Sequence, residues 1–237
     1  MPALPADVLR RHPHLADPLQ SGWVRVDLHA HTMWSGDSTT TPDEIEQAVL
    51  DSCIDVLCIT DHNTIRGAVE LSTRLPCRVI VGEEIKTTSG EIIGLFMTER
   101  IPAGGSAHDS AASIRAQGGL VYIPHPFDPM RQNIDAGALD ALIADGLVDA
   151  IEGLNAKTSL QSLNQRAVDL AAGQGIAVGA GSDAHVPGGI GAAYAEMPDF
   201  DGPTEFLAAL RLGHLVGHHW DEARPWTARV VPSFTTE

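Results

Sequence analysis

Two histidines separated by one residue stand at the end of a short apolar segment that runs from Val24 to His31. In a β-strand, residues i and i+2 project from the same face, so His29 and His31 would point toward one place. Imidazole is the commonest side-chain ligand of transition metals. A single His-x-His pair is more often exposed or structural than metal-binding, so the prediction of a metal site depends on further ligands later in the chain.

Imidazoles and carboxylates recur where later apolar segments end. The residues concerned are Asp61, His62, Glu83, Glu84, His125, Glu152, Asn155, Asp183 and His185, with Asp37 in the first polar loop. A chain with a net charge of −16 and 11 histidines could place some of them there by chance, but not repeatedly. Nitrogen and oxygen ligands without cysteine suit Zn²⁺, Mn²⁺ or Fe²⁺, and their number exceeds what one ion can hold. We therefore predict a cluster of two or three divalent ions, a type of site suited to phosphoester chemistry.

The candidate ligands are separated by segments that alternate between strand and helix patterns. Strands are expected near residues 24–31, 56–60, 78–81, 120–123, 148–152 and 176–179, and helices near 42–53, 106–117, 135–144 and 159–172. A hairpin strand is expected at 91–96, and the C-terminal part adds strands near 194–197 and 214–217 around a helix near 204–211. This alternation predicts an α/β fold, a TIM-like (β/α)7 barrel with its active site at the carboxyl ends of the strands.

Length and composition favour one large domain. With 237 residues, 43% of them hydrophobic, we expect an N-terminal arm over residues 1–22, lying across the barrel entrance, and a single barrel domain over 23–237. The net charge of −16 argues against long nucleic acid as a partner, because binding to the phosphate backbone usually needs a basic surface.

The cellular compartment is predicted from two features. No segment has the ~18 consecutive apolar residues of a membrane span, and none resembles a signal peptide. The three cysteines, Cys53, Cys58 and Cys77, lack CxxC spacing and are best explained as reduced thiols. We therefore expect a cytoplasmic protein with no membrane partner.

Six motifs, in order, resemble those of one protein family. They are His29-Ala30-His31, Ser35-Gly36-Asp37-Ser38, Ile59-Thr60-Asp61-His62-Asn63-Thr64, Gly82-Glu83-Glu84-Ile85, Ile123-Pro124-His125-Pro126 and Gly181-Ser182-Asp183-Ala184-His185. Together they resemble the PHP (polymerase and histidinol phosphatase) family of metal-dependent phosphoesterases. The resemblance implies a distorted seven-stranded barrel with up to three metal ions.

The resemblance also implies a ligand set. His29, His31, Glu84 and Asp183 would surround the first ion, and Glu84 would bridge to a second ion held also by His125 and Glu152. Asp37, His62 and His185 would hold the third. Glu83 stands where the family usually has valine, so Glu84 is the expected ligand of the pair.

The activity implied by the resemblance is hydrolysis of phosphomonoesters or small phosphodiesters by a metal-bridging hydroxide, with Asp183 and His185 as catalytic residues. Arg131 is a candidate to bind the phosphoryl group, with Lys157 as a second candidate; each could instead be an ordinary surface residue. The expected substrate is a small phosphorylated compound, which could be a nucleotide.

Two alternatives stay open. One is a 5′-3′ exonuclease or nucleotide 3′,5′-bisphosphate phosphatase, although the chain has no room between Glu84 and His125 for the subdomain that such relatives carry. The other is a metal-stabilised module without catalysis. The histidines that match no motif are predicted to be surface or packing residues: His12, His14, His108, His214, His218 and His219.

Overall fold

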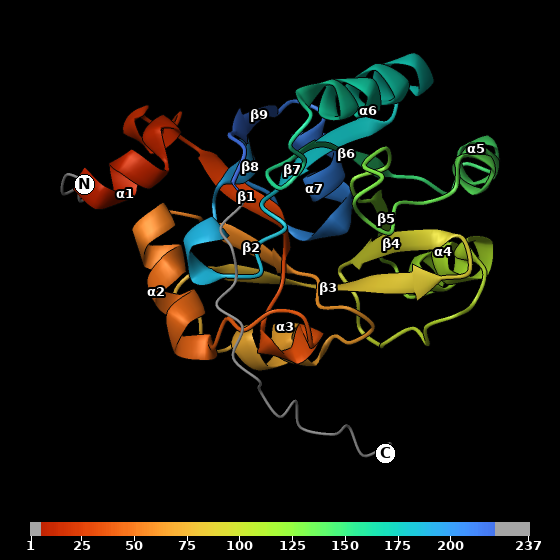
Figure 1. Ribbon diagram of the computed structural model, residues 1–237, viewed down its shortest axis with the longest axis horizontal. Helices are drawn as coiled ribbons and strands as arrows, with labels where there is room; N and C mark the ends of the chain where they lie inside the picture. The colour runs from red at the N-terminus through yellow and green to blue at the C-terminus, as the bar shows by residue number, and fades with distance from the viewer. Residues whose placement is uncertain (1–5, 221–237) are drawn as a thin grey trace.

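The computed structural model describes residues 6–220, and a single sheet organises them (Figure 1). Its nine strands are β1 (Trp23–Ala30), β2 (Val56–Ile59), β3 (Arg78–Thr87), β4 (Gly90–Leu95), β5 (Leu120–Ile123), β6 (Ala150–Asn155), β7 (Ala177–Gly181), β8 (Ala193–Pro198) and β9 (His214–Gly217). Among the described residues their order in the sheet is β7-β6-β5-β4-β3-β2-β1-β8-β9.

The sheet is a nearly closed barrel because the end of β1 meets the segment after β7. Asp183 donates its backbone N–H to the carbonyl of His29 (2.7 Å), and His31 donates to the carbonyl of Ala184 (2.9 Å). The first half of β1, from Trp23 to Val26, pairs instead with β8 in antiparallel register. The predicted α/β, TIM-like barrel is confirmed, and the divided pairing of β1 explains its distortion.

The strand β3 is longer than the sequence pattern predicts. A strand over 78–81 was expected to end at Glu83 and Glu84, but β3 continues to Thr87. Its first part pairs with β2 in parallel, and its second part forms the predicted hairpin with β4 in antiparallel register. The prediction that Glu84 follows a strand end is therefore wrong, since hairpin pairing keeps the chain extended through Glu84.

Helices cover the outside of the barrel and one helix closes its base. They are α2 (Pro42–Ser52), α3 (Arg66–Leu71), α4 (Ala107–Ala116), α5 (Ala136–Ala144), α6 (Gln161–Gln174) and α7 (Gly202–Leu210). Phe206 and Leu210 of α7 pack in one core cluster with inward residues such as Leu28 and Tyr122. These side chains fill the end of the barrel that α7 covers. Polar residues therefore line the opposite end.

The first described residues form α1 (Ala6–Arg11) and the 3₁₀ helix η1 (Pro13–Ala16). Val8 and Leu15 are buried against Ile45 of α2 and Tyr194 of β8. This part of the chain therefore packs beside α2 and β8, not across the barrel entrance. The division into an arm (1–22) and one domain (23–237) stays a prediction, and residues 1–5 and 221–237 lie outside the described part. Within 6–220, no helix has the length and apolar character needed to cross a membrane.

Candidate metal centre

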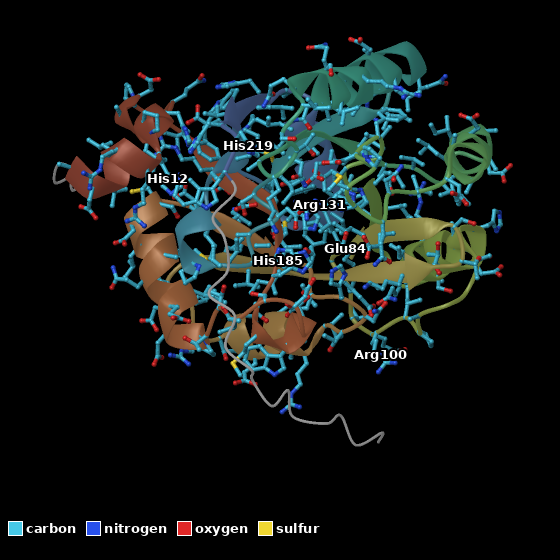
Figure 2. All side chains as sticks on the ribbon, in the orientation of Figure 1. His12, Glu84, Arg100, Arg131, His185 and His219 are labelled. Atoms are coloured by element: carbon cyan, nitrogen blue, oxygen red, sulfur yellow. The ribbon has the colours of Figure 1, made fainter. Side chains whose placement is uncertain are left out.

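Side chains from six strands or the turns after them converge at one end of the barrel. His29 lies in β1 with His31 directly after it, Glu84 lies in β3, and Glu152 lies in β6. His62, His125, Asp183 and His185 follow β2, β5 and β7, and Asp37 comes from the loop after β1. Figure 2 shows Glu84, Arg131 and His185 gathered near the middle of the barrel. The structure thus brings together the residues predicted to be ligands or catalytic groups.

The centre of the cluster is the carboxylate of Glu84. Its Oε2 atom lies 3.3 Å from Nε2 of His29 and 3.3 Å from Nε2 of His31. Its Oε1 atom lies 3.2 Å from Nε2 of His125. A carboxylate with imidazoles at both oxygens has the arrangement needed to bridge two cations. Bridging by Glu84 remains a prediction, which this geometry favours.

Asp37 joins two further imidazoles on the other side of the cluster. Its Oδ2 atom lies 3.3 Å from Nε2 of His62 and 3.1 Å from Nε2 of His185. His31 stacks near His185, with ring centroids 4.2 Å apart. The ligand atoms of His31, Asp37, His62 and His185 all lie within 4.8 Å of one another, close enough to share one ion.

Glu152 lies at the site but contacts protein donors. One oxygen accepts from Nδ1 of His29 (3.1 Å), and the other accepts from the backbone N–H of His125 (2.7 Å) and the amide of Asn155 (2.9 Å). No described group of candidate ligand atoms includes Glu152. Its predicted role as a ligand is untested, and these contacts favour a positioning role.

The contact with Glu152 fixes the proton of His29. Because Glu152 accepts from Nδ1 of His29, that atom carries a hydrogen, and Nε2 is the atom that takes a second proton or gives its lone pair to a metal. That Nε2 atom lies 3.0 Å from Nε2 of His31 and faces the carboxylates of Glu84 and Asp183. Electron-rich atoms that face one another in a buried site are stabilised by a cation between them, so these residues fit a divalent metal.

The charges of the cluster support the same conclusion. Burial opposes ionisation of Glu84, but the imidazoles of His29 and His62 outweigh it and hold the pKa of that carboxyl well below its usual range. Burial also disfavours the charged form of His29, but Glu84, Glu152 and Asp183 raise its pKa well above the usual value. Protons on the imidazoles therefore balance the buried carboxylates, and a divalent cation can take their place.

One residue at the site escaped the sequence analysis. Oε1 of Glu91 in β4 lies 3.5 Å from Nδ1 of His62, and the ligand atoms of His62, Glu84 and Glu91 form a possible group for one cation. Glu91 lies opposite Lys86 across the β3–β4 hairpin. The only signal in the sequence was its position two residues from the turn, on the barrel-facing side of the hairpin.

The cluster forms the floor of a pocket of about 150 Å³. Arg131 and Lys86 line it together with Glu84, His125 and Asp183. Nε of Arg131 lies 3.8 Å from Oδ2 of Asp183 and has no hydrogen-bond partner within the described chain. Lys157 is not among the residues that line the pocket, and its Nζ lies 3.0 Å from Nδ1 of His185. Arg131 is therefore the better placed of the two predicted phosphate-binding residues.

Two site residues have backbone conformations that L-amino acids rarely adopt. Asp183 has a φ of 50° and His125 a φ of 28°. Such conformations cost on the order of 1–3 kcal/mol each and occur mainly at functional sites. Each one turns the chain directly after a strand, so that the side chain faces the cluster.

Two of the candidates, Glu83 and Asp61, point away from the cluster. The side chain of Glu83 lies on the other face of β3 from Glu84 and accepts the backbone N–H of Ile101 (2.8 Å). Asp61 also faces inward to the protein, accepting from the N–H and the hydroxyl of Thr32 (2.6 Å each). Both carboxylates are hydrogen-bonded to groups of the surrounding protein and not to residues of the cluster.

Comparisons with known proteins agree with the predicted fold and family resemblance. The PHP domain family matches residues 27–116, and the PHP-associated family matches residues 161–215. Two uncharacterized proteins of Methanocaldococcus jannaschii are similar to the chain. MJ1587 is 41% identical over 146 residues, which is 56% of this chain and 82% of the relative. MJ0417 is 35% identical over 198 residues, which is 80% of each protein.

A solved structure from Bacteroides vulgatus shares the fold. It is a two-domain protein containing a predicted PHP-like metal-dependent phosphoesterase, and it matches with a TM-score of 0.68 at 18% identity over 85% of this chain and 67% of its own. The fold is a barrel that carries a cluster of possible metal ligands at one end. The chain belongs to the PHP domain family.

Proposed function

We propose that this protein hydrolyses phosphomonoesters or small phosphodiesters at the centre that contains Glu84. The observation that carries the proposal is the placement of a cationic guanidinium, that of Arg131, on the wall of a pocket whose floor is a cluster of metal-ligand side chains. Phosphoester hydrolysis needs both elements, since the phosphoryl oxygens must be bound and their growing negative charge balanced.

The proposed cofactors are two or three Zn²⁺, Mn²⁺ or Fe²⁺ ions. Their ligands would be His29, His31, Asp37, His62, Glu84, His125, Asp183 and His185, with Glu91 as a further carboxylate in reach. Divalent ions bound there would lower the pKa of a water molecule and would neutralise negative charge on the phosphoryl oxygens. Glu84, at the centre of the imidazoles, would hold the ions together.

The chain's own groups have separate tasks in this proposal. Arg131 binds and orients the phosphoryl group, and Asp183 aligns the guanidinium through the contact at 3.8 Å. Burial and the neighbouring His31 lower the pKa of His185 to about 4, so its imidazole is neutral at neutral pH and offers a lone pair to a cation or a proton. We assign catalysis to Asp183 and His185 on this basis.

The substrate in this proposal is small. A pocket of about 150 Å³ accommodates a phosphoryl group and its immediate surroundings, and the net charge of −16 opposes a long polyanion. No observation favours a nucleotide over other phosphorylated compounds. We place the activity in the cytoplasm, where Cys53, Cys58 and Cys77 would stay the free thiols seen here.

The test is release of inorganic phosphate from a panel of phosphomonoesters and small phosphodiesters with Mn²⁺ or Zn²⁺ supplied. Turnover should fall at least about a hundredfold in His29→Ala, because a buried ligand is lost. The matched control is His108→Ala, since His108 is exposed and contacts only Asp145 among the ion pairs described. Bound metal without turnover on any substrate would contradict the proposal and favour a non-catalytic module.

Arg131→Ala separates substrate binding from metal binding. Loss of a charge-assisted contact to phosphate costs about 1.5–3 kcal/mol, so kcat/KM should fall roughly 10- to 100-fold. The number of bound metal ions should stay unchanged, because Arg131 offers no ligand atom. An unchanged kcat/KM would remove Arg131 from the proposed site.

A further inference from the structure

Three of the histidines that match no motif lie together, outside the barrel site. His12 precedes η1, His14 lies within it, and His218 follows β9. One ring nitrogen from each lies within 4.8 Å of the others. His14 and His218 are 204 positions apart in the chain, yet their Nδ1 atoms are 3.3 Å from each other. Figure 2 shows His12 on the side of the arm, well separated from Glu84.

The hydrogen bond of His14 leaves a lone pair in the middle of the cluster. Nε2 of His14 lies 3.3 Å from the carbonyl oxygen of Gly191. A carbonyl can only accept, so Nε2 carries the hydrogen and Nδ1 of the neutral ring is a bare acceptor. That acceptor lies 3.3 Å from Nδ1 of His218, which donates a hydrogen to it when no metal is bound and would give up that hydrogen to share the metal.

His12 provides an independent observation. The residue is 3% exposed, and its Nδ1 atom has no hydrogen-bond partner in the described chain. A buried nitrogen without a partner costs about 1–3 kcal/mol, and such groups in native proteins usually have an unseen water or ion as partner. His12 is also the residue that completes the group of three with His14 and His218.

Three neutral imidazoles, with no carboxylate in the group, are a ligand set for a borderline metal ion. Burial and the neighbouring His218 and His14 lower the pKa of His12 to about 4 against a backbone hydrogen bond to Gly188. Burial likewise lowers the pKa of His14 to about 4. Both rings are therefore neutral at neutral pH, the form that binds metal. Mg²⁺ and Ca²⁺ prefer oxygen, so this site discriminates against them.

We propose that His12, His14 and His218 form a second metal site, which binds Zn²⁺ or a similar transition-metal ion through three imidazoles. A water would complete the tetrahedral shell. The site lies apart from the pocket proposed for catalysis, so this proposal does not depend on the proposed phosphoesterase activity.

The contacts around the site show what such an ion would stabilise. It would join the arm to the segment after β9, and the hydrogen bonds of His12 to Gly188 and of His14 to Gly191 anchor the arm to the connection between β7 and β8. That same connection begins with Asp183 and His185. The structural role of the ion would thus be to hold the arm in place against the end of the β7–β8 connection, whose start carries Asp183 and His185.

The first test is the zinc content of the full-length protein, stripped with a chelator, reloaded with Zn²⁺ and desalted. His14→Gln and His218→Gln should each bind about one zinc ion fewer per chain than the wild type. His108→Gln makes the same substitution at an exposed histidine and should leave the content unchanged. His29→Ala combined with His218→Gln should show the two losses added. An unchanged zinc content in both His14→Gln and His218→Gln overturns the proposal.

A second test needs no variant and covers the case in which these variants fail to fold. Trypsin can cleave after Arg10, which is exposed in α1. If the ion fixes the arm, Zn²⁺ should slow cleavage of the metal-free wild type there by roughly tenfold, whereas Mg²⁺ at the same concentration should not. Equal cleavage rates with Zn²⁺, with Mg²⁺ and with chelator would overturn the proposal.

Discussion

At the scale of single residues, Glu152 decides how the metal centre is supported. Its two oxygens accept from His29, His125 and Asn155, so the lone pairs that a metal would need are engaged by the protein. A carboxylate that accepts from the far nitrogen of a ligand histidine fixes the tautomer of that ring and increases its basicity. Glu152 can therefore matter for metal binding without touching the metal.

Substitution of Glu152 by glutamine distinguishes positioning from ligation. If Glu152 positions His29, Glu152→Gln should lower the affinity for metal roughly 10- to 100-fold but preserve the number of ions bound at saturation. Competition with a chromophoric chelator measures both quantities. The exposed Glu99 offers a control, Glu99→Gln, which should change neither. Loss of an ion at saturating metal would show that Glu152 is itself a ligand.

The same residues show what sequence patterns can and cannot predict. Histidines and carboxylates that follow apolar segments were found because position along one strand fixes which face a side chain takes. Glu91 was missed because its place beside His62 depends on pairing between β3 and β4. His12, His14 and His218 were interpreted as surface or packing residues, since no local pattern reveals a contact between the two ends of the chain.

At the scale of elements, the end of β7 lies so close to β1 that only glycine fits at position 181. A Cβ atom there would overlap Cβ of His29 and lie 2.7 Å from Oε1 of Glu152. Neither neighbour can move freely, because both are buried and bonded to each other. The predicted motif contained Gly181 without a reason for it, and the contact between β1 and β7 supplies the reason.

Gly181→Ala should therefore affect stability and metal binding together. Overpacking of this kind costs about 1–3 kcal/mol, and displacement of His29 should also reduce metal content. Denaturant unfolding and metal analysis measure the two effects. Gly173→Ala in α6 is the matched control, since nothing lies within 4 Å of an added Cβ and alanine favours the helix by roughly 0.5–1 kcal/mol. A neutral Gly181→Ala variant would show that β1 and β7 are not so closely joined.

The outer face of β3 makes the stability of the protein depend on pH. Glu83 is fully buried there, and burial raises its pKa to about 7 despite the N–H of Ile101. The folded state therefore keeps a proton that the unfolded state, with a pKa near its usual value, releases. This contribution to stability is complete below about pH 4.5 and is lost as the pH rises through about 7.

Glu83→Gln should remove that dependence. Between pH 5 and 8 the wild type should lose about 2–3 kcal/mol of unfolding free energy through this group, and the variant should not. Denaturant titrations in the presence of chelator measure the difference without a contribution from bound metal. Identical pH dependence in wild type and variant would show that Glu83 ionises in the folded state as it does in water.

At the scale of the whole molecule, one connection links the two histidine clusters. The segment between β7 and β8 carries Asp183 and His185 at its start, and at its end the carbonyl of Gly191 accepts from His14. The barrel fold and its open end were predictable because alternating strands and helices close in few ways. The antiparallel pairing of β8 with the edge of β1, and of β9 with β8, was not predictable. This pairing brings His218 next to the arm.

Charge gives the molecule a general dependence on cations. A net charge of −16 destabilises a compact chain through self-repulsion, and the buried carboxylates of Glu84 and Asp183 add a local demand for positive charge. A site filled at a hundred times its Kd stabilises the folded state by about 2.7 kcal/mol. For a chain of this size, Zn²⁺ or Mn²⁺ should raise Tm by roughly 5–10 °C per site filled.

Scanning calorimetry at constant ionic strength separates specific binding from screening. NaCl matched in ionic strength weakens repulsion between surface charges to the same extent, so it should reproduce only a small part of the increase. His29→Ala should lose the part of the increase that comes from metal bound at the centre containing Glu84. Mn²⁺ favours oxygen ligands, so it should stabilise the site of His12, His14 and His218 less than Zn²⁺ does. If NaCl alone raises Tm as much as either metal, relief of charge repulsion is the whole effect and neither cluster binds a cation in the folded protein.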